Sequence, residues 1–259
     1  MTGPRVAAIG DSMTLGVGDG LQQAWGQVGW ARHTADALGA SDYLCTAANG
    51  ARARDLPSQA ARVRRWNPDI VLCTIGGNDA LRADFDAHEV QECATRALQL
   101  LAAPPRRLVL MTIDRIGLFD LMPRRVSAVM AERAQRVNTA LRSAGDLVQV
   151  SWVDGAAVMA DVGVRGWHVD RIHPSPLGHR ALAQQAVTVV TPQWPMTARI
   201  PAAPPTPSRP AQMWWLVQHG TPWAFKRSKD LLPAVVGVIA TELAHEGRRR
   251  HSADDALRG

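Results

Sequence analysis

The sequence has few cysteines: its 259 residues include only Cys45, Cys73 and Cys93. Three thiols cannot all pair with one another, and no Cys-x-x-Cys spacing of the kind that binds metal is present. Cys45 and Cys73 fall within apolar runs that predict buried strands, so we interpret them as core thiols. The sequence therefore gives no sign of a disulfide framework, a metal site or a cofactor.

Long apolar runs are also missing, since no stretch reaches the roughly 20 apolar residues that a membrane-spanning helix needs. The first strand-like run begins at Arg5, which leaves no room before it for a signal peptide, so we expect a cytoplasmic protein. The net charge is +6, but the basic groups are scattered and no aromatic residues interleave them. This pattern favours an arginine-rich surface over nucleic-acid binding.

Apolar runs of strand length alternate with segments of helical periodicity along most of the chain. The strand-like runs are residues 5–9, 43–47, 69–74, 107–113 and 147–153, and the helix-like segments are 31–38, 55–66, 87–101, 125–143 and 176–190. Such alternation is typical of parallel strands joined by right-handed crossovers. We therefore expect an α/β domain over residues 1–192, a three-layer α/β/α sandwich with a five-stranded parallel sheet.

The first strand-like run leads into a Gly-Asp-Ser segment, which places Ser12 at the carboxyl edge of the predicted sheet, where α/β sheets bind ligands. Serine becomes a good nucleophile when a base removes its proton and a third group orients that base. Asp170 and His173 are spaced so that, on a tight turn, the carboxylate reaches the imidazole from the side opposite Ser12. His168 is a rival base, and we expect His179 to cap the last helix or face solvent.

Two further segments follow strand-like runs, Ala48-Asn49-Gly50-Ala51 and Ile75-Gly76-Gly77-Asn78-Asp79. With the serine and histidine segments they make four blocks that resemble, in content and order, those of the SGNH/GDSL hydrolase family over roughly residues 5–190. The resemblance implies a flavodoxin-like sheet and an esterase-type serine hydrolase with no cofactor and no metal. It implies Ser12 as nucleophile, His173 as general base and acid, and Asp170 as the carboxylate that orients His173.

The resemblance also implies an oxyanion hole made by the backbone N–H groups of Ser12 and Gly50 and the side-chain amide of Asn78. The residue types suit this role, because glycine lets a backbone N–H approach a ligand and an asparagine amide stays neutral at every working pH. We interpret Asp11 and Asp79, which adjoin site residues, as carboxylates that organise the loops.

The expected reaction is hydrolysis of a small-molecule ester through an acyl-enzyme. The same groups can pass an acyl group to a sugar or alcohol, so an acyltransferase is the alternative. A non-catalytic binding protein on the same fold is a third possibility, against which the intact set of site residues argues. The four blocks do not distinguish lipid, acetylated polysaccharide, thioester and aryl ester substrates.

Two regions lie outside the alternating pattern. The apolar loop 114–124 leaves the carboxyl end of the fourth strand, where it either borders the substrate site or packs against helices. Proline-rich residues 193–211 predict a linker, and residues 212–259 predict a Trp-rich helical extension with a helix at 230–245 and a disordered end. Its aromatic side chains need apolar cover, from the hydrolase domain, from self-association or from a membrane surface.

Overall fold

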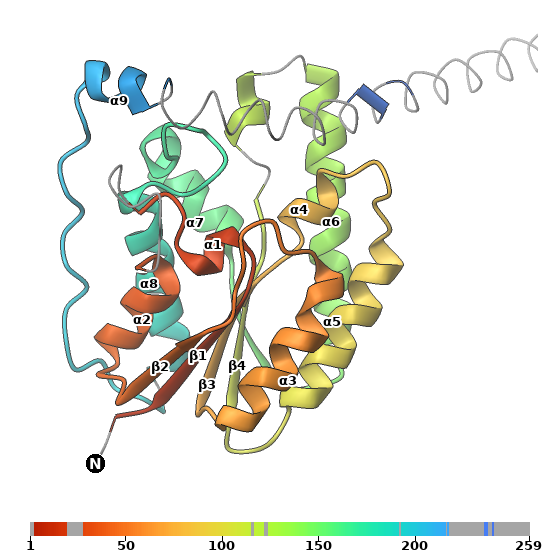
Figure 1. Cartoon of the computed structure of the whole chain (residues 1–259), viewed down its shortest axis with the longest axis vertical. Helices are drawn as coiled ribbons and strands as arrows, with labels where there is room; N and C mark the ends of the chain where they lie inside the picture. The colour runs from red at the N-terminus through yellow and green to blue at the C-terminus, as the bar shows by residue number, and fades with distance from the viewer. Residues whose placement is uncertain are drawn as a thin grey trace, which may run out of the picture.

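Five parallel strands form a single sheet in the order β2-β1-β3-β4-β5, with helices on both faces (Figure 1). The computed structural model describes residues 3–19, 28–114, 117–121, 124–191 and 193–215, together with 217, 236, 237 and 240. The strands are β1 (Arg5–Gly10), β2 (Asp42–Cys45), β3 (Ile70–Thr74), β4 (Arg107–Met111) and β5 (Val150–Val153). The predicted α/β sandwich and its five-stranded parallel sheet are confirmed.

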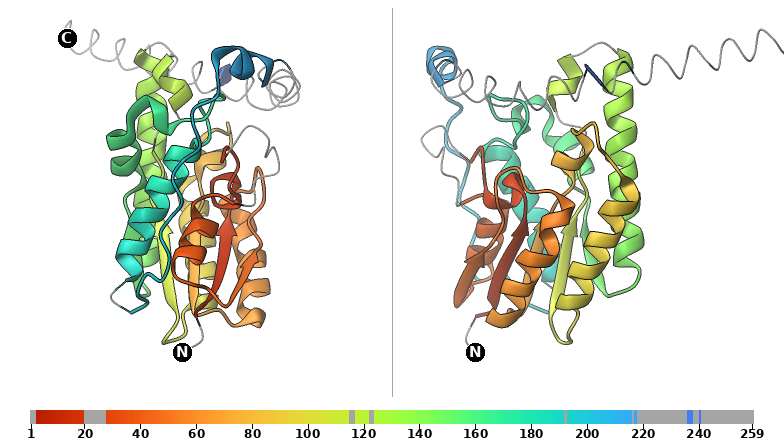
Figure 2. Two further views of the ribbon diagram at one scale, coloured as in Figure 1. Left: turned by 90° about the vertical axis from the view of Figure 1, so that its left-hand side faces the viewer. Right: turned by 45° about the vertical axis from the view of Figure 1, so that its right-hand side comes forward.

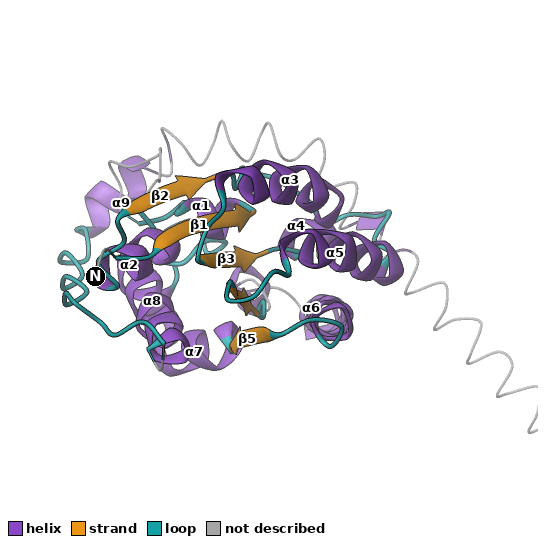
Figure 3. Ribbon diagram, turned by 90° about the horizontal axis from the view of Figure 1, so that it is seen from below, coloured by secondary structure: helices purple, strands orange, loops and turns teal. Residues whose placement is uncertain are grey.

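The helices divide between the two faces of the sheet, as the view along the strands shows (Figure 3). One face carries α3 (Leu56–Trp66), α5 (Ala87–Leu101) and α6 (Arg124–Gly145), and the other carries α2 (Trp30–Ala37), α7 (Gly155–Val162) and α8 (Pro176–Val190). Shorter elements are α1 (Ser12–Leu15), α4 (Gly77–Ala80), α9 (Arg209–Trp215) and the 3-10 turns η1 (Ala53–Asp55), η2 (Gly117–Leu121) and η3 (Gly163–Gly166). The sequence pattern predicted α2, α3, α5, α6 and α8 but not α7.

Successive residues of β3 point to opposite faces and so enter two separate cores. Val71 and Cys73 pack in the core under α3, α5 and α6, whereas Ile70 and Leu72 pack in the core under α2 and α8. Every residue of β3 is buried, because the strand lies inside the sheet with helices on both faces. β2 lies at the sheet edge, and Cys45 is therefore only half-buried, a correction to its expected place in the core.

The chain beyond α8 runs along the α2–α8 face, on the side turned to the viewer in the left panel of Figure 2. Trp194 and Ile200 pack against the core of that face. The Thr197 N–H donates to the carbonyl of Ala37 at 2.8 Å, and Arg180 donates to the carbonyl of Pro201 at 2.9 Å. The first part of the predicted linker is thus held against the domain.

Little of the predicted C-terminal extension lies in the described part of the chain. Trp214 on α9 is 62% exposed. Most of the helix predicted at 230–245 lies outside the described residues, as does Trp223. The boundaries at 192 and 211 stay a prediction. Among the residues described, no helix has the length and apolar character needed to cross a membrane.

Candidate active site

Ser12 begins α1 directly after β1, on a turn that requires glycine before it. Gly10 has a φ of +123°, and a Cβ there would collide with the carbonyl oxygen of Thr74. The side-chain amide of Gln59 accepts the Gly10 N–H at 2.6 Å and donates to its carbonyl at 3.1 Å. Asp11 caps α1 by accepting the Met13 N–H at 2.9 Å. These contacts fix the position of Ser12 at the carboxyl edge of the sheet.

Asp170 and His173 share a tight turn that faces Ser12. One oxygen of Asp170 accepts the N–H groups of Ile172 and His173 at 2.9 and 3.0 Å. Its other oxygen lies 2.8 Å from Nδ1 of His173, and Nε2 of His173 lies 2.9 Å from the Ser12 hydroxyl. Because a carboxylate only accepts, Nδ1 carries the imidazole proton and Nε2 accepts the Ser12 hydroxyl proton. The structure thus brings the three predicted residues into one hydrogen-bonded chain.

The rival histidine lies beside the same carboxylate but at a longer distance. Nδ1 of His168 is 3.5 Å from Asp170, and His168 is buried. Burial on its own would raise the pKa of Asp170, but the charges and hydrogen bonds of His173 and His168 outweigh it and hold that pKa below its usual value. Asp170 therefore stays ionised at neutral pH, as an acceptor for Nδ1 of His173.

The second buried carboxylate beside the serine behaves differently. Burial, together with the charge of Asp79, raises the pKa of Asp11 to about 7, although the hydrogen bond from Met13 and the charge of His173 act against this. Asp11 is thus half protonated near neutral pH, whereas Asp170 is fully ionised.

A pocket opens over Ser12 and His173, at the carboxyl ends of the central strands. Its wall includes Asn78 and Asn49, the neighbour of Gly50, and is otherwise largely apolar; the apolar side chains are Met13, Leu81, Ile113, Met159, Trp167 and Ile172. Gly50 has a φ of +81°, which favours glycine. Asn78 donates from its amide to the carbonyl of Ala51 at 3.0 Å. The loop of Gly50, Asn78 and Ser12 therefore meet at this pocket.

The described part of the apolar loop 114–124 borders the pocket and also packs against α6. Asp114 lies in the pocket wall, and Phe119 is buried against Leu81 and Met130. The Leu118 N–H donates to the carbonyl of Arg171 at 2.8 Å. The loop therefore also supports the turn that carries His173.

His179 corrects an expectation, because it neither caps α8 nor faces solvent. It is fully buried, accepts the Trp30 N–H at 3.1 Å through Nδ1, and donates from Nε2 to the carbonyl of Val17 at 2.9 Å. Burial lowers its pKa to about 4, so it is neutral at neutral pH. His179 ties α2 and α8 to the turn after α1. No local signal predicts this, because both partners are distant in sequence.

A second buried cluster beside that turn was not predicted. Asp19 lies 2.8 Å from Nε2 of His33 and 2.6 Å from the guanidinium of Arg180. The adjacent Gly18 has a φ of +99°, and a Cβ there would collide with the carbonyl of Pro174 and crowd His173. Asp19 thus anchors the turn that backs His173. In the sequence, the only sign of this cluster is the glycine-containing turn after the serine block.

A serine hydroxyl, an imidazole and a carboxylate joined in this order, at the carboxyl edge of a parallel sheet, are typical of serine hydrolases on α/β folds. The model of the GDSL-like lipase/acylhydrolase family matches residues 8–181. The chain belongs to this family, and it is a hydrolase of the esterase/lipase type. No curated protein matches the sequence.

Solved structures of several esterases and lipases share the fold. The chain is similar to Axe2, an acetylxylan esterase from Geobacillus stearothermophilus, with 21% identity, a TM-score of 0.58, and coverage of 76% of this chain and 98% of that one. It is similar to the lipase Lip_vut3 from a goat rumen metagenome, with 20% identity, a TM-score of 0.55, and coverage of 71% and 96%. A lipolytic protein of the G-D-S-L family from Veillonella parvula has 15% identity, a TM-score of 0.57, and coverage of 72% and 98%.

Proposed function

We propose that this protein cleaves small-molecule carboxylic esters through an acyl-enzyme on Ser12. The observation that carries the proposal is the chain from the Ser12 hydroxyl to Nε2 of His173 at 2.9 Å and from Nδ1 to Asp170 at 2.8 Å. In the first step, the Ser12 oxygen attacks the ester carbonyl and its proton passes to Nε2 of His173. The ionised Asp170 keeps Nδ1 protonated and stabilises the imidazolium.

The tetrahedral intermediate then collapses, and His173 gives its proton to the departing alcohol. A water molecule then enters, His173 takes a proton from it, and the water oxygen attacks the acyl carbon. His173 returns the proton to the Ser12 oxygen as the carboxylic acid leaves. The N–H groups of Ser12 and Gly50 and the amide of Asn78 stabilise the oxyanion in both steps. The apolar pocket wall receives the acyl group or the leaving group.

The proposal is tested with a fluorophosphonate probe and a series of p-nitrophenyl esters of rising chain length, with acetylated sugars beside them. Wild-type protein should be labelled and should release p-nitrophenol, whereas Ser12→Ala should do neither and should keep its melting temperature. Ser58→Ala is the matched control, because the Ser58 hydroxyl is exposed and bonds only to the carbonyl of Asp55 among the described contacts. Full ester hydrolysis by Ser12→Ala would remove Ser12 as the nucleophile.

The choice of base is tested by two histidine variants. His173→Ala should lose activity about as completely as Ser12→Ala, because triad members act as a unit. His168→Ala should lose less, and the opposite order would show that His168 is the base. Added alcohols or sugars in the same assay reveal acyl transfer as an ester product.

A further inference from the structure

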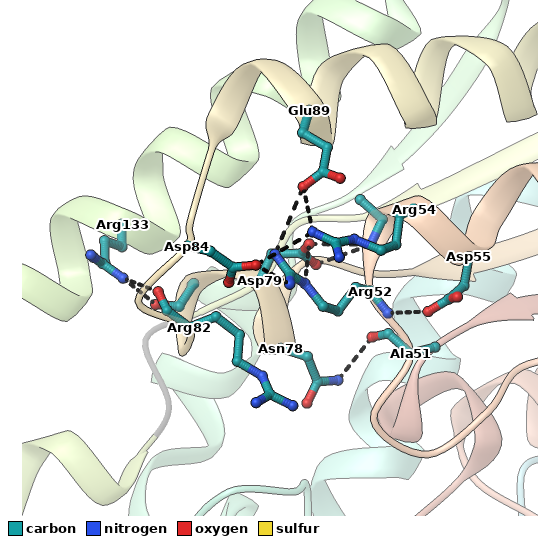
Figure 4. A network of polar contacts seen from close by, with 12 residues as sticks. Ala51, Arg52, Arg54, Asp55, Asn78, Asp79, Arg82, Asp84, Glu89 and Arg133 are labelled. Atoms are coloured by element: carbon teal, nitrogen blue, oxygen red, sulfur yellow. Dashed lines mark hydrogen bonds and ion pairs between the residues drawn. The ribbon is translucent and has the colours of Figure 1, made fainter. Parts of the chain in front are cut away.

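The loop that carries Gly50 and the helix that carries Asn78 are joined by a cluster of charged side chains (Figure 4). The loop follows β2, whereas α4 follows β3, and β1 with Ser12 lies between these two strands. The proposed oxyanion donors thus stand on separate segments, whose spacing the sheet alone does not set. Side-chain contacts between the two segments must therefore help to set this spacing.

Asp79 makes the main contact between these segments. Its carboxylate accepts the Ala53 N–H at 3.1 and 3.3 Å, and Nε of Arg52 donates to it at 3.2 Å. The preceding residue, Asn78, donates to the carbonyl of Ala51 at 3.0 Å. Residues 78 and 79 of α4 therefore bind three successive residues of the loop that begins at Gly50.

The pairing of Asp79 with Arg52 is buried and specific. Asp79 is 1% exposed, and burial raises its pKa, while the Ala53 N–H and Arg52 act against that rise. A carboxylate buried this deeply is costly unless it is paired and hydrogen-bonded. Arg52 is fixed at its other end by Asp84, 2.9 Å from Nη1. This buried pair therefore holds the loop against α4.

The opposite side of α4 is also held. Arg133, from α6, donates to the carbonyls of Ala80 and Arg82 at 3.1 and 2.7 Å, and Figure 4 shows its contact with Arg82. Gly76, just before α4, has a φ of +105° and lies so close to Val137 of α6 that a Cβ would collide with it. Because α4 is seated on α6, the contact between Asp79 and Arg52 sets where the Gly50 loop lies relative to Asn78.

We propose that Arg52 and Asp79 are positioning residues that set the spacing between the Gly50 N–H and the Asn78 amide, and with it the geometry of the oxyanion hole. The inference rests on the proposed ester hydrolysis. Neither side chain lines the pocket, so both act through the two donors. Such donors must lie about 2.7–3.1 Å from the developing oxyanion, and a displacement of about 1 Å can cost roughly 10²-fold in rate.

The first experiment measures kcat and KM on p-nitrophenyl acetate for Asp79→Asn and Arg52→Gln. Each should lower kcat by roughly 10- to 100-fold with little change in KM, because the donors act on the transition state. Arg54→Gln is the control: Arg54 belongs to the outer part of the cluster, 3.0 Å from Glu89 and 3.5 Å from Asp84. This variant should keep kcat close to wild type. Arg52→Lys, which keeps the charge, should recover part of the loss.

The second experiment separates positioning from a general structural role by a double-mutant cycle on kcat. In the Asn78→Ala background, Asp79→Asn should lose a clear part of its effect, because one of the two donors whose spacing it sets is gone. If Asp79→Asn lowers kcat by the same factor in both backgrounds, within roughly 2-fold, the two residues act independently and the inference is overturned. If Asp79→Asn does not fold, the same cycle is run with Arg52→Gln.

The outcomes for the two proposals differ. A wild-type protein that neither hydrolyses esters nor reacts with a fluorophosphonate would overturn the proposed function and this inference together. An active wild type, an inactive Ser12→Ala and an additive cycle would overturn the positioning role alone. Equal losses in Arg52→Gln and the control Arg54→Gln would also overturn it.

Discussion

The buried imidazole of His179 predicts a specific pH dependence of stability. Burial lowers its pKa from 6.5 to about 4 in the folded protein. Between these values the unfolded chain binds a proton that the folded protein does not, so stability falls as the pH falls. Each pH unit in this window is worth about 1.4 kcal/mol, and lowering the pH from 7.5 to 5 should cost about 2 kcal/mol through this group.

Asp11 contributes with the opposite sign over almost the same range. Burial raises its pKa from 3.8 to about 7, so between these values the folded protein binds a proton that the unfolded chain does not. Stability from this group therefore rises as the pH falls, by between about 2 and 3 kcal/mol from pH 7.5 to 5. In the wild type the two contributions largely cancel, and each becomes visible only when the other is removed.

The assay is urea unfolding of wild type, His179→Asn and Asp11→Asn at pH 7.5 and 5. His179→Asn should be less stable at pH 7.5, because the carbonyl of Val17 loses its donor, but its deficit should shrink by about 2 kcal/mol at pH 5. Asp11→Asn lacks the group that stabilises the wild type as the pH falls. Relative to wild type, this variant should therefore be less stable at pH 5 than at pH 7.5, by about 2–3 kcal/mol. A deficit of His179→Asn that is the same at both pH values would refute the neutral, buried imidazole.

Three further predictions concern the oxyanion hole, the seat of α4 and the end of the chain. Asn78→Ala should lower kcat on p-nitrophenyl acetate by roughly 10²–10³-fold with a modest change in KM, and an unchanged kcat would remove Asn78 from the mechanism. Gly76→Ala should lower the unfolding free energy by more than Gly163→Ala. Both glycines have positive φ, but of the two only Gly76 has a neighbour, Val137, with which an added Cβ would collide. Equal losses of unfolding free energy would contradict this packing argument. A chain ending at residue 208 should fold and hydrolyse p-nitrophenyl acetate. A chain ending at residue 192 should melt at a lower temperature, because it loses the apolar packing of Trp194 and Ile200. Equal melting temperatures of the two chains would show that this packing contributes nothing.

The sequence predicted the sheet well because its strands are apolar runs with clear boundaries. All five residues of β3 are buried, so the run is continuous and easy to recognise. Helix α7 was missed because residues 155–162 follow β5 after one residue and lack a polar face. The Asp154 side chain that caps α7 reads equally well as a turn residue.

Residues of the site could be predicted where a sequence block or a short spacing marks them, as for Ser12 and His173, and not where only packing between distant segments defines their contacts. Asp170 and His173 are three residues apart, and the turn between them makes the contact. The clamp of Gln59 on Gly10 joins residues 49 apart, and the contact of His179 with Trp30 joins residues 149 apart. A glutamine on a helix and a histidine at a helix start usually face solvent, and only the packed fold shows otherwise.

The supports of the site divide into two sets, and this division has a mechanistic consequence. Contacts of Gly10, Gln59 and Thr74 hold Ser12 at the edge of the sheet. Helix α4 connects the proposed oxyanion donors to the same sheet. His173 rests on loops, through the Leu118 contact with Arg171 and the strand-like pairing of Trp167 with Pro174. Catalysis of the proposed kind needs donors that do not move while the oxyanion forms, whereas the base must carry a proton from Ser12 to the leaving group. The proposed oxyanion donors are thus held by the sheet and α4, whereas the proposed base is held by contacts between loops.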